Sequence, residues 1–172
     1  ARNPLAPNIS GAVVWDAEHR VSLGLNMGGF PVAWVRFRDA DHLPDRAAWY
    51  VNWDPTDLAV RLEHGVRLLL NSCHDRLTEA VSQPALPESK PVLEFLYFDV
   101  GRTLIQGALR QEEFVTPGHE FDPGSVGYRL RTLLSALFPA IPLSVLAERA
   151  LREPGRFERE LQGALRILGA LS

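Results

Sequence analysis

The chain has 172 residues, 46% of them hydrophobic, with a formal net charge of −3 and a single cysteine, Cys73. This length and composition suit one domain with its own core, and one cysteine excludes an internal disulfide or a multi-cysteine zinc site. The mild negative charge argues against nucleic acid as a partner, and no apolar run reaches the roughly 18 residues of a membrane span. We therefore expect a cytoplasmic protein without a membrane partner or cofactor.

All but one of the 18 Lys and Arg residues are arginines, the exception being Lys90. This bias is typical of GC-rich, mostly bacterial genomes and carries little chemical information. The chain begins at Ala1 without the features of a secretion signal. We expect a mature or trimmed protein, or a domain of a larger protein.

The first part of the chain shows strand patterns after a loose arm at residues 1–10. Apolar and polar residues alternate, or apolar residues run together, in segments 12–16, 20–25, 31–38 and 48–53. Turn-forming residues separate these segments. Four strands in succession predict an antiparallel meander with one apolar face.

The clearest period in the sequence lies between Thr56 and Val81. Leucines and valines recur there every three or four residues, as on one face of an amphipathic helix. Asp54 and Pro55 suit a helix start, and Gly65 is the one interior weakness. We predict one helix over Thr56–Val81 that covers the meander, with its charged side in solvent.

Three prolines make segment 83–91 a candidate link between two subdomains, residues 11–82 and residues 92–172. The following run VLEFLYFDV, residues 92–100, is apolar on both faces apart from two acids, which predicts a central strand. Segment 103–109 would be its partner strand, with a short helix as the alternative.

Helical spacing returns after a loop rich in proline and glycine, residues 116–124. It predicts helices over residues 126–137, 143–152 and 154–171. The whole pattern predicts an α+β fold in a single domain, residues 1–172: an antiparallel sheet packed by a long central helix, followed by a helical C-terminal subdomain.

Two groups of residues are candidates for contacts with another protein. Trp34, Arg36 and Arg38 share one face of a predicted strand, and tryptophan and arginine are enriched at the centres of interfaces. Coverage by another segment of the same chain is the simpler alternative. Phe157, Leu161 and Leu168 form the stripe of the last helix, which would pack into the core or form the seam of a homodimer.

An alternative site would bind a metal ion. His119, Glu120 and Asp122 lie in one loop whose prolines and glycines could fix its shape. With His42 brought near by folding, they would provide the nitrogen and oxygen ligands of a small metal-dependent hydrolase.

No motif of a nucleotide-binding loop, a zinc protease or a serine hydrolase occurs. We therefore expect a noncatalytic protein-interaction module, such as an adaptor, a chaperone-like domain or an inhibitor. Its partner would be another protein or another part of a longer chain. The hydrolase with the His119 loop is the alternative.

Overall fold

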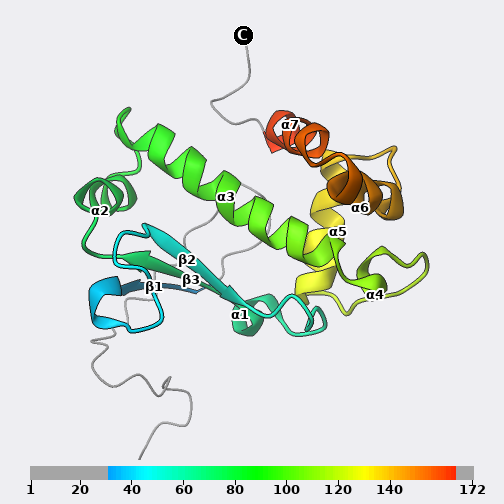
Figure 1. The fold of residues 1–172 in the computed structure, drawn as a ribbon, viewed down its shortest axis with the longest axis horizontal. Coiled ribbons are helices and arrows are strands. Elements are labelled where there is room, and N and C mark those ends of the chain that lie inside the picture. The colour runs from blue at the N-terminus through cyan, green and yellow to red at the C-terminus, as the bar shows by residue number, and fades with distance from the viewer. Residues whose placement is uncertain (1–30, 166–172) are drawn as a thin grey trace, which may run out of the picture.

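The structure is a computed structural model that describes residues 31–165. Within these residues the fold is α+β, with a small mixed sheet and seven α-helices. One long helix, α3, lies across the sheet, and helices α5, α6 and α7 gather at its far end (Figure 1). The predicted α+β class and helical C-terminal part are confirmed. The strands predicted at 12–16 and 20–25 lie outside the described residues.

The sheet has three described strands in the order β1-β3-β2. They are β1 (Val32–Val35), β2 (Trp49–Trp53) and β3 (Val66–Asn71). β1 runs parallel to β3, and β2 runs antiparallel to it. The predicted antiparallel meander is therefore wrong for this part of the chain. The strand that separates β1 from β2, β3, comes from a segment for which the sequence predicts a helix.

The predicted helix over Thr56–Val81 is also wrong. That segment forms the short helix α1 (Leu62–Gly65), strand β3 and helix α2 (Asp75–Ser82). In β3, Val66, Leu68 and Leu70 are buried on one face of the sheet. Leu69 faces the other side, where it is also partly covered. Because both faces are partly apolar, the alternation of a strand was hidden and a spacing of three or four residues could be read instead.

Gly65 marks the change from helix to strand. A β-carbon at this position would lie 2.2 Å from Cγ1 of Val60 and 3.0 Å from Cγ2 of Val126. Only a residue without a side chain allows the backbone to pass Val60 this closely. The interior weakness that the sequence showed is thus the point where the helix ends.

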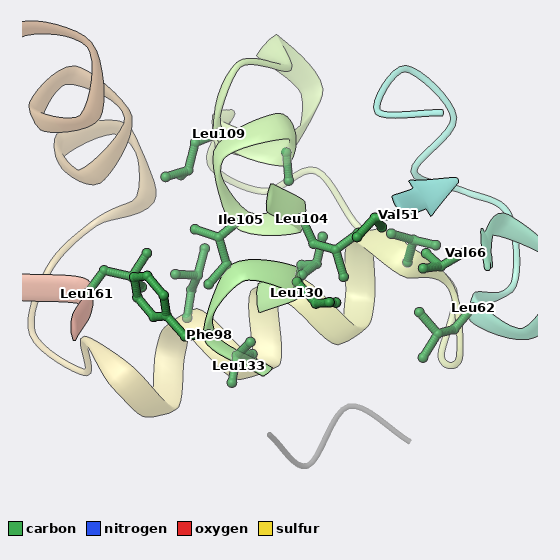
Figure 2. Close-up of a cluster of buried hydrophobic side chains, with 14 of the residues drawn as sticks. Val51, Leu62, Val66, Phe98, Leu104, Ile105, Leu109, Leu130, Leu133 and Leu161 are labelled. Carbon is green, nitrogen blue, oxygen red and sulfur yellow. The ribbon is translucent and has the colours of Figure 1, made fainter. Parts of the chain in front are cut away.

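Helix α3 (Ser89–Leu109) replaces the strand predicted at residues 92–100 and the strand or short helix predicted at 103–109. A helix that is apolar nearly all round is buried on several sides. Figure 2 shows the reason: Leu104 points towards Val51 on the sheet side, whereas Phe98 points towards Leu161 of α7.

The link before α3 is shorter than expected. Residues 84–88 form turns, and Pro91 lies in the first turn of the helix, where its missing N–H leaves no hydrogen bond unmade. The main hydrophobic cluster combines residues from both sides of segment 83–91.

Four helices follow α3: α4 (Glu112–Val115), α5 (Val126–Leu137), α6 (Leu143–Arg152) and α7 (Pro154–Leu165). The helices predicted at 126–137 and 143–152 are confirmed, as is the described part of the last one. Ser125 caps α5, because its hydroxyl accepts a hydrogen bond from the N–H of Tyr128 at 3.2 Å. Gly124, with φ of +94°, makes the turn into this cap.

A second, smaller cluster of Phe37, Ala40 and Leu43 packs on the other face of the sheet. It belongs to the 3₁₀ helix η1 (Phe37–Asp39) and the loop that follows. The buried side chain of Asn71 holds this loop, because its amide donates to the carbonyls of Asp45 and Ala47 at 3.0 and 2.8 Å.

Candidate interaction site

A groove of about 660 Å³ opens between the C-terminal ends of α3 and α6 and the start of α7. Its walls include Leu109 and Arg110 at the end of α3, Ala147, Leu151 and Arg152 on α6, and Pro154 at the start of α7. A volume of this size lies within the range of about 300–1,000 Å³ that is typical of ligand pockets. We call this feature the α3–α6 groove.

One apolar side chain of helix α6 lines the groove and is not buried in the core. Leu146 is fully buried in the main cluster, and Ala147 and Ala150 pack against that cluster. Leu151, in contrast, is 81% exposed, the most exposed of the large apolar side chains between residues 31 and 165. Leu151 therefore adds an exposed apolar side chain to the lining of the groove.

The hairpin of α6 and α7 is fixed from both sides. Phe157 and Leu161 of α7 are buried in the main cluster. On the outside, the guanidinium of Arg149 donates to the carboxylate of Glu160 at 2.6 Å. This hydrogen bond, together with Arg156, lowers the pKa of the Glu160 carboxyl. The groove wall is therefore held by both packing and charge.

The charges around the groove do not cancel. Glu148 and Arg152 are one helical turn apart and form an exposed ion pair at 3.4 Å. Arg110 is exposed at the end of α3 and forms no ion pair with any residue from 31 to 165. One positive charge is therefore left uncompensated among the described groove residues.

Gln106 in the groove lining is connected to the sheet through a series of polar side chains along α3. Gln106, which lines the groove, donates a hydrogen bond to Glu158 of α7. Arg102 lies 3.9 Å from the same carboxylate and 2.8 Å from Asp99. Asp99 in turn accepts a hydrogen bond from the indole of Trp49 at 2.8 Å.

The residues predicted for protein contacts lie elsewhere. Trp34 is half-buried against the main cluster, whereas Arg36 and Arg38 are exposed after β1. Phe157 and Leu161 are 1% and 0% exposed and pack in the main hydrophobic cluster. Leu168 lies outside the described residues.

The residues of the alternative metal site are not brought together. His42 lies in the loop after β1, at the opposite end of the molecule from the loop that follows α4 and carries His119 (Figure 1). Among residues 31–165, no three histidines, cysteines or carboxylates are placed to hold a metal ion. Glu120 and Asp122 are exposed.

Arg131 of α5 organises the loop of His119 instead. Its guanidinium donates to the carbonyls of Glu113, Phe114 and Thr116 at 3.0, 2.6 and 3.2 Å, and also to that of His119. The same group lies 5.0 Å from the ring centre of Phe121 and 5.6 Å from that of Phe114. Desolvation lowers the pKa of Arg131. The loop is shaped by a structural cation.

Sequence reasoning missed the groove, and no signal in the sequence singles it out. Leu151 follows Ala147 by four residues and Leu143 by eight, which is the spacing of an ordinary buried stripe. The exposure of Leu151 depends on where α3 ends relative to α6. The sequence of either helix alone does not determine that position.

Comparisons of the chain with protein-family models, with curated proteins and with solved structures found no match. In the part of the chain that the structure describes, the helices include none with the length and apolar character needed to cross a membrane. The functional assignment therefore depends on the geometry of the described surface.

Proposed function

We propose that this chain is a noncatalytic protein-interaction module, an adaptor, chaperone-like or inhibitor domain, that binds its partner through the C-terminal helices. The observation that carries the proposal is Leu151, which stands 81% exposed at the edge of the α3–α6 groove. Interfaces commonly combine an apolar centre with a polar rim. The groove has this composition, with Leu109 and Ala147 inside it and Arg110 and Arg152 at its edge.

The titratable groups support binding rather than acid–base chemistry. Hydrogen bonds from Thr56 and Arg61 lower the pKa values of Asp54 and Glu63, respectively. Glu160, whose pKa is also lowered, lies in the ion pairs of α7. These three carboxyl groups are surface groups on separate segments, whereas a catalytic site gathers its shifted groups around one cavity.

The proposal includes a bacterial source, which the arginine-rich composition supports, and a cytoplasmic location. The partner is another protein or a further part of a longer chain. The formal charge of −3 makes nucleic acid a poor candidate, because such partners are bound mainly through positive charge.

The test is site-specific photo-cross-linking in an extract of the native cells. A photoreactive amino acid replaces Leu151 in the full chain, and in a second variant it replaces Leu86, an apolar residue that is 37% exposed outside the groove. We expect a covalent adduct of defined mass from position 151 and none from position 86.

Two results would contradict the proposal. If neither position gives an adduct, the chain has no protein partner at this surface under native conditions. If both positions give the same set of adducts, the contacts reflect general stickiness of exposed apolar side chains.

A further inference from the structure

The α3–α6 groove has an apolar floor. Leu109 of α3 lines the groove and is only 5% exposed. Ala147 and Ala150 are small, so they allow an incoming segment to approach the α6 backbone closely. Leu151 stands at the edge and would lose most of its exposed surface when the groove is filled. The groove therefore selects for apolar side chains.

The charge at the groove adds a second requirement. Glu148 and Arg152 satisfy each other at 3.4 Å, whereas Arg110 has no ion-pair partner among residues 31–165. Arg110 is the C-cap residue of α3, where the helix dipole favours a cation, and it lines the groove. A carboxylate that enters with an apolar segment can form a two-pronged ion pair with this guanidinium.

We propose that the α3–α6 groove binds an apolar segment of a partner protein that carries an acidic residue beside its leucine-sized side chains. This inference rests on the proposed function and specifies the chemistry of the partner. The apolar side chains cover Leu151 and Ala147, and the carboxylate pairs with Arg110. A basic segment is disfavoured by like charge. A symmetric contact between the grooves of two copies is disfavoured as well, because each groove would bring an arginine without an ion-pair partner among residues 31–165.

Two synthetic peptides of equal length test this chemistry. Both carry leucines spaced to form one face of a helix. One has glutamates beside the leucines, and the other has lysines at the same positions. Binding to the full chain is measured by fluorescence anisotropy at physiological salt. We expect the glutamate peptide to bind at least about tenfold more tightly than the lysine peptide.

Three variants of the full chain separate the apolar and the charged contributions. We expect Leu151→Gln to weaken both peptides by about fivefold or more, because it removes the exposed apolar side chain without adding charge. Arg110→Glu should reverse the preference, so that the lysine peptide binds more tightly. Leu86→Gln, outside the groove, should change neither affinity by more than about twofold. All three positions are exposed, so the fold should be retained.

Several outcomes would overturn the inference. Equal affinity for the two peptides, or an Arg110→Glu variant that keeps the original preference, would remove the acidic requirement. If the wild type sediments as a dimer and the Leu151→Gln variant as a monomer, the groove is an interface between two copies of this chain. If neither peptide binds although position 151 cross-links to a protein, the partner chemistry is wrong and the interaction function stands. If the cross-link fails too, both are wrong.

Discussion

The indole N–H of Trp49 donates a hydrogen bond to the carboxylate of Asp99 at 2.8 Å, which joins β2 to the middle of α3. The other oxygen of Asp99 accepts from Arg102 at 2.8 Å. The ring of Trp49 also lies edge-on to Phe95, with centroids 5.7 Å apart. One carboxylate therefore helps to fix how the long helix crosses the sheet.

Replacing Asp99 should lower the free energy of unfolding. We expect Asp99→Ala to lose about 1–2 kcal/mol, because the half-buried indole of Trp49 loses its acceptor. Asp99→Asn should lose less, because its amide oxygen can still accept from the indole. Urea unfolding followed by tryptophan fluorescence measures both. Glu63→Gln, which breaks the exposed pair with Arg61, is the control and should cost under about 0.5 kcal/mol.

Replacing Arg131 even by lysine should lower the free energy of unfolding. Its planar guanidinium reaches several backbone carbonyls of the loop at once, and an ammonium group cannot do so. We expect Arg131→Lys to cost about 2 kcal/mol of unfolding free energy and to speed amide exchange in residues 113–119. Arg129→Lys, an exposed change on the same helix, should do neither. Equal stability of the two variants would show that the loop does not depend on these bonds.

Two glycines in helices should respond to alanine in opposite directions. A β-carbon at Gly107 of α3 would lie 2.4 Å from Cζ2 of Trp53, so Gly107→Ala should destabilise the protein by about 1–3 kcal/mol through overpacking. Gly163 of α7 has open space around it, and Gly163→Ala should stabilise the protein by up to about 1 kcal/mol. Thermal unfolding compares them. A stabilised Gly107→Ala variant would contradict the packing of Trp53 against α3.

Acid should weaken the hairpin of α6 and α7. Arg149, with Arg156, holds the pKa of Glu160 below its ordinary value in the folded state. The resulting stability is fully present above the unfolded-state pKa, about 4.3 for a glutamate. It is lost as the pH falls through the lower folded-state pKa. The free energy of unfolding should therefore fall with acid in the wild type. We expect Glu160→Gln to make this fall less steep between about pH 5 and pH 3. An unchanged acid profile would contradict the coupling.

Several elements could be predicted from sequence because their signals are local. Strand β2 alternates, and α5 and α6 begin and end at residues that cap or break helices, such as Ser125 and Pro142. The two wrong assignments share one cause. In β3, Leu69 is partly covered on the face opposite Leu68, and α3 is apolar towards both the sheet and α7. Where two faces are buried, the period of the sequence no longer distinguishes strand from helix.

The candidate site was less predictable than the fold. The loop of His119 contains residue types that can bind a metal ion, which is why the sequence suggests a site there. In the structure, Arg131 instead donates hydrogen bonds to the backbone carbonyls of Phe114 and His119. The groove depends on Arg110 and Leu151, which are 41 residues apart by their numbers and are brought together only by the packing of α3 on α6. No pattern within a single element encodes that arrangement.

The most direct measurement of the central claim is the affinity of the purified full chain for the protein that cross-links from position 151. Isothermal titration calorimetry compares wild type, Leu151→Gln and Leu86→Gln. The account predicts that Leu151→Gln weakens binding by about fivefold or more, whereas Leu86→Gln leaves it unchanged within about twofold. Equal affinity for all three proteins would contradict the assignment of the groove as the binding surface.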